Sequence, residues 1–144
     1  ELVKKNDITA VYKDFAHAPS KLKATISAMK EQYPNRKLVA CMELHTFSSL
    51  TDAFLLQYAG TMDVADEAIV YFNPHAVEHK KLPPLDTQRV LQGFGNDRIK
   101  IYTDSKQLTN DIMAMNWDNG NLLLMSSGNF DGVDFNDLAN NIVI

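Results

Sequence analysis

The 144-residue sequence lacks the features that mark several classes of protein. It has no apolar run near the roughly 20 residues that a bilayer-spanning helix needs, and its first residues lack the apolar stretch of a secretory signal. It has a single cysteine, Cys41, so no internal disulfide can form. Cys41 lies in the apolar run 38–42, where we expect a buried thiol. These absences favour a protein of the reducing cytoplasm that contacts no membrane.

Charge and motif spacing exclude further functions. A net charge of −4 does not favour nucleic-acid binding. Neither G-x-x-x-x-G-K-[ST] nor G-x-G-x-x-G is present, so the chain has no glycine-rich phosphate cradle of its own. The four histidines are His17, His45, His75 and His79. They show no H-E-x-x-H spacing and no cysteine pair accompanies them, so we expect no metal site. Without G-x-S-x-G, a serine hydrolase is not expected.

Short apolar runs alternate with amphipathic stretches along the chain. The predicted strands are residues 8–13, 38–42, 68–72, 99–102 and 122–125. The predicted helices are residues 19–33, 50–58, 87–94, 105–115 and 135–142. Repeated β–α units of this kind predict an α/β fold, a three-layer α/β/α sandwich with a mostly parallel sheet of about five or six strands. No second domain is visible, so we expect one domain over residues 1–144.

Polar segments follow the predicted strands, at the edge where ligands bind to parallel sheets. These segments are residues 14–17, 43–49, 73–79, 103–105 and 126–129. Asp14 is suited to accept hydrogen bonds from a ribose. Residues 126–129 would bring N–H and hydroxyl donors to an anion, or form an ordinary loop. Glu43 and Glu78 would either face a ligand at this edge or act as helix caps or solvated charges.

One of these segments resembles a family signature. Asp14-Phe15-Ala16-His17-Ala18-Pro19 resembles the D-[FY]-A-H-x-P motif that opens the C-terminal domain of Mur ligases. The likeness extends over nearly the whole chain. It continues in residues 20–25, 36–40, 43–49, 65–66 and 124–128. Within the family, Phe15 and Glu43-Leu44-His45 are most similar to members that join the peptide L-Ala-γ-D-Glu-meso-diaminopimelate to UDP-N-acetylmuramate.

The resemblance implies a Rossmann-like domain that closes over ATP and binds the incoming peptide. In the family, ATP and Mg²⁺ are held mainly by a central domain, and the UDP-sugar by an N-terminal domain. Neither domain is in this sequence, which begins without Met, so we expect a piece of a longer cell-wall ligase. The isolated domain is expected to be inactive, with no catalytic residue of its own. The alternatives are a domain of the sibling that adds free L-alanine, and a non-catalytic Rossmann-like nucleotide-binding module.

Residue roles follow from the same resemblance. Asp14 would contact the ATP ribose, and Phe15 and His17 would line the nucleotide pocket. Another loop would lie near phosphate through His45, Thr46 and Ser49. The residues expected to face the peptide are Asn73, Pro74, His75, Glu78, Ser126, Ser127 and Gly128.

Overall fold

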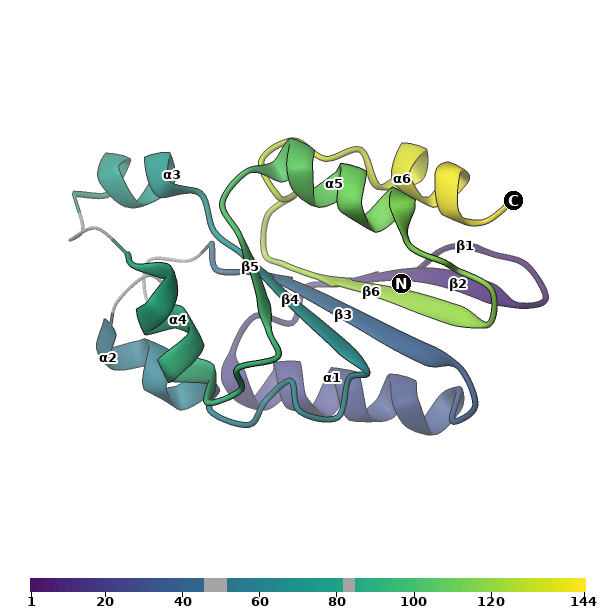
Figure 1. The fold of residues 1–144 in the computed structure, drawn as a ribbon, viewed down its shortest axis with the longest axis horizontal. Helices are drawn as coiled ribbons and strands as arrows, with labels where there is room; N and C mark the ends of the chain where they lie inside the picture. The colour runs from purple at the N-terminus through teal and green to yellow at the C-terminus, as the bar shows by residue number, and fades with distance from the viewer. Residues whose placement is uncertain (46–51, 82–84) are drawn as a thin grey trace.

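A computed structural model describes residues 1–45, 52–81 and 85–144, and its centre is one β-sheet (Figure 1). The strands are β1 (Leu2–Lys5), β2 (Thr9–Asp14), β3 (Lys37–Glu43), β4 (Glu67–Tyr71), β5 (Lys100–Tyr102) and β6 (Gly120–Met125). Their order in the sheet is β1-β2-β6-β3-β4-β5. β1 runs antiparallel to β2, and all other neighbours are parallel. The predicted α/β class is confirmed.

Helices cover both faces of this sheet. They are α1 (Pro19–Gln32), α2 (Asp52–Leu55), the 3₁₀ turn η2 (Leu56–Tyr58), α3 (Pro74–His79), α4 (Thr87–Phe94), α5 (Ser105–Ala114) and α6 (Phe135–Ile142). Figure 1 shows α1, α2 and α4 on one face and α5 and α6 on the other. Two apolar clusters separate the layers, one built on α1 and the other on α5 and α6. The three-layer prediction is therefore confirmed.

The local sequence explains where these elements start and stop. In β3, every residue from Leu38 to Glu43 is buried, as expected for a strand covered on both faces. Pro19 occupies the first turn of α1, where a missing N–H is harmless. The side chain of Asp104 accepts a hydrogen bond from the Lys106 N–H and so caps α5. Gly95 ends α4 in the left-handed conformation, with φ of 65°.

The structure corrects the sequence-based elements in three places. β1 was not predicted, because it is an edge strand in which Val3 is only half-buried and its neighbours are exposed. The sequence predicts only a polar strand end where α3 lies, because six residues are too few to show a helical period. The predicted helix 50–58 changes type within the described residues, because α2 ends at Leu55 and residues 56–58 form the 3₁₀ turn η2. Residues 50 and 51 lie outside the described residues.

The chain connections change from one face of the sheet to the other on each side of β6. After β2, β3 and β4 the chain forms α1, α2 and α4 on one face, whereas after β5 and β6 it forms α5 and α6 on the opposite face (Figure 1). β6 lies between β2 and β3, so its two neighbours send their chains to the other side. Ligands of open parallel sheets bind at such switch points, beyond the carboxyl ends of the strands. Among the described residues, no helix is long and apolar enough to cross a membrane.

Candidate functional site at the carboxyl end of β6

Three parallel strands end side by side at the switch point. Asp14 of β2 is paired with Met125 of β6, and Met125 is also paired with Met42 of β3. The backbone N–H of Ser126 then donates to the carbonyl of Asp14 at 3.0 Å. The pairing therefore brings three polar segments together, those that begin at Asp14, Glu43 and Ser126.

The segment after β2 is a tight polar turn. Oδ1 of Asp14 accepts a hydrogen bond from the N–H of Ala16 at 2.7 Å. Nδ1 of His17 lies 2.7 Å from the carbonyl oxygen of Phe15, which orients the imidazole. The turn leaves the Phe15 side chain 78% exposed, an unusual position for a large apolar ring. The turn thus offers a carboxylate, an aromatic face and an oriented imidazole.

A buried tyrosine is hydrogen-bonded to the backbone of this turn. The Tyr58 hydroxyl donates to the His17 carbonyl oxygen at 2.6 Å. Its ring stacks on Phe94 of α4 with centroids 4.9 Å apart. Burial raises the pKa of Tyr58 to about 12, so the phenol remains a neutral donor at physiological pH. The backbone at His17 is thereby tied to the α1 face of the core.

A buried carboxylate organises the loop that follows β6. Glu43, the last residue of β3, is only 2% exposed. Its Oε1 accepts hydrogen bonds from the Ser126 hydroxyl at 2.7 Å and from the Phe130 N–H at 2.9 Å. The Ser126 Oγ in turn accepts from the Gly128 N–H at 2.8 Å. Residues 126–130, called here the β6 loop, are therefore anchored at both ends to one side chain.

His45 lies against the same loop. Its Nδ1 is 3.6 Å from Oε2 of Glu43. Gly128 packs so closely on the imidazole that a Cβ placed there would lie 3.1 Å from ring atoms of His45. The ammonium of Lys80, just after α3, donates to the His45 carbonyl oxygen at 2.6 Å. His45 thus connects β3, the β6 loop and the end of α3.

A hollow of about 420 Å³ opens on the β2 side of β6. It is lined by Glu1, Lys13, Asp14, Phe15, Leu124, Ser126, Gly128 and Phe135. Two aromatic rings and a leucine provide apolar walls, and the carboxylate and hydroxyl provide polar groups near the strand ends. Such a mixture suits a flat ring that carries hydroxyl groups.

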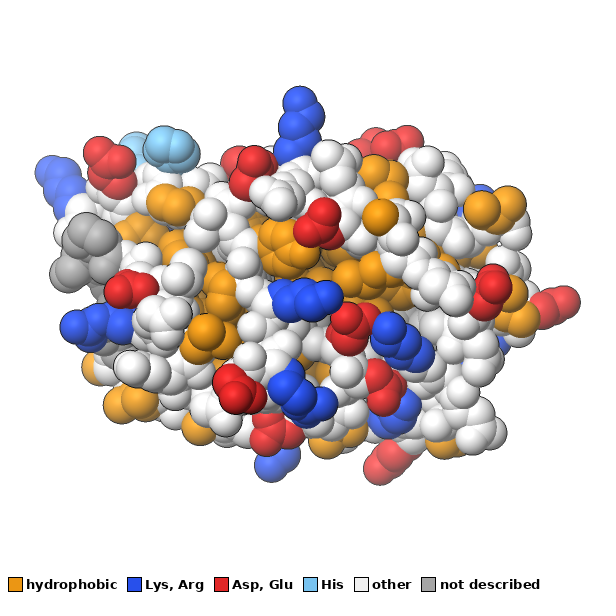
Figure 2. All heavy atoms as spheres, in the orientation of Figure 1, with side chains coloured by type: hydrophobic (Ala, Val, Ile, Leu, Met, Phe, Trp, Pro, Cys, Tyr) orange, Lys and Arg blue, Asp and Glu red, His pale blue; other side chains and the backbone are white. Residues whose placement is uncertain are grey.

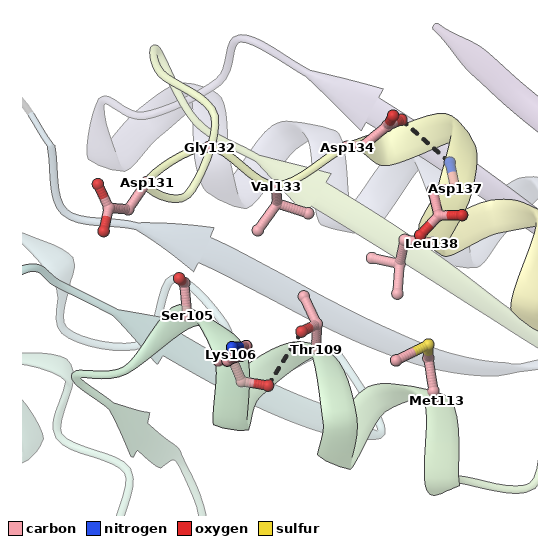
Figure 3. A pocket seen from close by; sticks show the side chains of 10 residues that line it. All are labelled: Ser105, Lys106, Thr109, Met113, Asp131, Gly132, Val133, Asp134, Asp137 and Leu138. Carbon is pink, nitrogen blue, oxygen red and sulfur yellow. Dashed lines mark hydrogen bonds between the residues drawn. The ribbon is translucent and has the colours of Figure 1, made fainter.

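A second hollow, of about 220 Å³, lies between α5 and α6 (Figure 3). One wall carries three carboxylates, those of Asp131, Asp134 and Asp137. Asp134 is engaged in capping, because its Oδ1 accepts from the Asp137 N–H at 3.0 Å. A wall of negative charge disfavours an anionic ligand. This hollow has Lys106 against three carboxylates, whereas the switch-point hollow has Lys13 against two, so the switch-point hollow is the better candidate for a phosphate-bearing molecule.

The face shown in Figure 2 has no single basic patch, because Lys and Arg side chains are interspersed with Asp and Glu. Ion pairs at the amino ends of the strands are of this mixed kind. Glu67 bonds Lys37 at 2.7 Å and Lys100 at 3.2 Å, and the hydrogen bond from Lys37 is the main reason that the pKa of Glu67 is lowered. Within the described part of the chain, no three His, Cys, Asp or Glu side chains form a group that could hold a metal ion.

The structure brings together some of the residues predicted from sequence. Asp14, Phe15, Ser126 and Gly128 line one hollow. His45 packs on Gly128, whereas His17, on the Asp14 turn, is not among the residues that line this hollow. Oγ of Ser127 is buried with no hydrogen-bond partner among the described residues. Thr46 and Ser49 lie outside the described residues.

The other predicted peptide-facing residues lie on or beside α3. Asn73 accepts from the His75 N–H at 2.9 Å and so caps this helix, and Pro74 is its first residue. His75 and Glu78 are exposed on it. None of the four lines the hollow that contains Asp14. These residues are therefore separate from the nucleotide-facing group.

Sequence reasoning left the most connected residue of the site undecided. The sequence leaves open whether Glu43 faces a ligand, caps a helix or is a solvated charge, whereas in the structure it is buried and anchors the β6 loop. A signal was present: Glu43 directly follows an entirely apolar strand, and such a strand is buried on both faces. A carboxylate in that position needs buried donors, and the hydroxyl of Ser126 follows another apolar strand.

Comparisons with known proteins agree with this architecture. A family model described as "Mur ligase, glutamate ligase domain" matches residues 1–128. The UDP-N-acetylmuramate–L-alanine ligase of Lactococcus lactis subsp. cremoris is 30% identical over 129 residues, which are 88% of this chain and 27% of that protein. The chain thus spans about a quarter of the length of this relative.

Two solved structures share the fold. The murein peptide ligase of Psychrobacter arcticus superposes with a TM-score of 0.74 at 18% identity, over 99% of this chain and 29% of that one. A single domain provisionally assigned to a UDP-N-acetylmuramate:L-alanyl-γ-D-glutamyl-meso-diaminopimelate ligase of Haemophilus ducreyi superposes with a TM-score of 0.66 at 22% identity, over 99% and 95% of the two chains. Taken with the family match, the fold and the polar switch point show that this chain belongs to the Mur ligase family, as its glutamate ligase domain.

Proposed function

We propose that this chain is the C-terminal domain of an ATP-dependent ligase of the cytoplasm that joins the peptide L-Ala-γ-D-Glu-meso-diaminopimelate to UDP-N-acetylmuramate. The observation that carries the proposal is the meeting of the Asp14 turn and the β6 loop in one hollow at the switch point. In this role the domain closes over ATP held by a central domain and presents the amine substrate. The N-terminal and central domains of the same polypeptide are its partners.

The Asp14 turn has the groups needed for the nucleoside part of ATP. Oδ1 of Asp14 is committed to the Ala16 N–H, so Oδ2 is the oxygen that would accept a ribose hydroxyl. The exposed Phe15 ring gives an apolar surface for the adenine, because planar rings stack on aromatic faces. The His17 imidazole, oriented by the Phe15 carbonyl, is not among the residues that line the hollow, and it would contact the nucleotide from beside the Asp14 turn.

The chemistry begins when the muramate carboxylate attacks the γ-phosphorus of ATP, giving an acyl phosphate and ADP. The peptide amine then attacks the acyl carbon, loses a proton, and expels phosphate, which keeps one oxygen of the original carboxylate. Bound Mg²⁺ would neutralise phosphate charge, and the central domain would hold it. The described residues of this chain contribute by orienting ATP and the amine and by excluding water.

The amine substrate would approach from the β6 loop. Ser126 and Gly128 line the hollow there, whereas the Ser127 Oγ is buried, and His45 would lie towards the transferred phosphate. The Lys80 ammonium, just after α3, donates to the His45 carbonyl oxygen, so a tripeptide would extend from the β6 loop towards α3. Asn73, Pro74, His75 and Glu78 would then contact its far end, with the Glu78 carboxylate suited to an ammonium group.

A second candidate is the ligase that adds free L-alanine. The relative from Lactococcus lactis, at 30% identity, carries that name and favours it. Free alanine would use the β6 loop but would not reach α3. The two candidates therefore differ in whether the exposed residues of α3 take part.

A substrate panel tests both candidates on the longer polypeptide expected to contain this chain. Phosphate release from ATP is measured with UDP-N-acetylmuramate and either the tripeptide or L-alanine. We expect release with the tripeptide and at least about tenfold less with L-alanine at equal concentration. The reverse preference establishes the second candidate. Absence of amine-dependent release with either substrate refutes the ligase.

A further inference from the structure

Glu43 occupies a buried position, where a charged carboxylate needs compensating interactions. Along β3, Val39 and Cys41 pack into the cluster on the α5–α6 side, and Glu43 continues that alternation at the end of the strand. It is 2% exposed, so its charge is almost entirely removed from water. Such a group persists only where hydrogen-bond donors replace the lost solvent. The donors that do so identify what Glu43 holds.

Both donors to Oε1 come from the β6 loop. The Ser126 hydroxyl is at its start and the Phe130 N–H at its end, at 2.7 and 2.9 Å. The backbone beyond this anchor is unusual, because Phe130 and Asp131 have positive φ values of 56° and 61°. Residues with a Cβ adopt this region only where surrounding contacts impose it. The carboxylate of Glu43 is one of those contacts.

The second oxygen of Glu43 faces His45. Nδ1 of His45 lies 3.6 Å from Oε2, and Gly128 packs on the imidazole ring. One side chain therefore contacts the start of the β6 loop, its end, and the histidine that rests on its middle. Moving Glu43 would change the position of the whole loop relative to His45.

We infer that Glu43 is a positioning residue for the amine substrate. It fixes the β6 loop against His45 so that Ser126 and Gly128, which line the hollow, meet the substrate in one conformation. The identity of the substrate in this inference rests on the proposed function. The structural part, which is the anchoring of the β6 loop by Glu43, does not. Glu43 touches no reactant and acts through the loop.

The structural part is tested on the 144-residue chain by amide hydrogen exchange. Glu43→Ala removes both hydrogen bonds, so exchange at Phe130 should speed by at least about tenfold. Glu43→Gln keeps a neutral acceptor and should give an intermediate increase of about threefold. Glu67→Ala is the matched control, because it removes a carboxylate that pairs with Lys37 and Lys100 at the other end of the sheet. It should leave exchange at Phe130 unchanged.

The functional part is tested in the longer polypeptide. Glu43→Ala should raise the KM of the amine substrate at least about tenfold, while the KM of ATP changes less than about threefold. Should Glu43→Ala not fold, Glu43→Gln carries both tests with the smaller effects. Unchanged exchange at Phe130 in a folded variant, or equal KM increases for both substrates, overturns the inference. A wild-type protein without amine-dependent phosphate release refutes the proposed function instead, and leaves the exchange result valid.

Discussion

Substitutions of Asp14 separate its structural role from its proposed role in binding. Asp14→Ala removes the acceptor of the Ala16 N–H, which is 2.7 Å away in the wild-type turn. Ala16 is only 4% exposed, so its N–H regains little solvent. Leaving a buried donor without a partner costs about 1–3 kcal/mol, and we expect the lower half of that range at this half-exposed turn. For a domain of this size the melting temperature should fall by about 3–7 °C.

Asp14→Asn isolates the binding role. Asparagine keeps a carbonyl oxygen for the Ala16 N–H, so the free energy of unfolding should stay within about 0.5 kcal/mol of wild type. It loses the charged oxygen proposed for the ribose, which should raise the KM of ATP by about tenfold in the longer polypeptide. A raised KM in Asp14→Ala alone would report only the disrupted turn.

The assays are thermal unfolding of the 144-residue chain, followed by circular dichroism, and ATP kinetics of the longer protein. Two results refute the reasoning. If Asp14→Ala is as stable as wild type, the hydrogen bond to Ala16 contributes nothing to the turn. If Asp14→Asn is folded and its KM for ATP is unchanged, Asp14 does not contact the ribose.

Three further predictions concern the scaffold. A Cβ at Gly93 would lie 2.8 Å from the Leu55 carbonyl oxygen. Because that atom belongs to the backbone, overpacking should cost the upper part of its usual range, about 2–3 kcal/mol, against a helix-propensity gain of about 1 kcal/mol. Gly93→Ala should therefore be destabilised by about 1–2 kcal/mol in urea unfolding. In Gly120→Ala the nearest atom is at 3.6 Å, so the loss should stay under about 1 kcal/mol, and equal losses would contradict this packing. Burial pushes the pKa of Asp66 upwards, but hydrogen bonds from Lys30 and the Leu38 N–H outweigh it, so the net pKa lies below 3.8. Wild type should therefore have a larger free energy of unfolding than Asp66→Asn above about pH 4, and the difference should disappear as the pH falls through the lowered pKa. A difference that does not change with pH would exclude this linkage. Burial raises the pKa of the Cys41 thiol well above its usual range. Iodoacetamide should therefore label native protein at least about 100-fold more slowly than unfolded protein. Comparable labelling rates would show that β3 opens.

The sequence predicted the regular elements wherever the local signal agreed with the environment. β3 and β6 are continuous apolar runs, and both are central strands. α5 and α6 begin at the expected residues because Asp104 and Asp134 cap them. The failures have a common cause, which is shortness. β1 has four residues and α3 has six, so neither shows a period, and their existence depends on pairing with β2 and on the Asn73 cap.

The site was predictable in part. Asp14 and Ser126 are candidates because the residues after parallel strands meet at one edge, and Phe15 is a candidate from the family resemblance. The structure places all three around one hollow. The order of the strands was not available from the sequence, so nothing indicated that β6 lies between β2 and β3. That order explains why Glu43 reaches Ser126, a contact between residues 83 positions apart. Roles that depend on sheet order need the structure.

Hydrogen exchange of the longer polypeptide, with and without bound substrates, tests the central claim most directly. The claim is that the carboxyl end of β6 is where this domain meets its ligands. With a non-hydrolysable ATP analogue, UDP-N-acetylmuramate and the tripeptide bound, exchange should slow in residues 14–18 and 126–130. Protection confined to residues 105–113 beside the α5–α6 hollow, or no protection in this domain, would contradict the account.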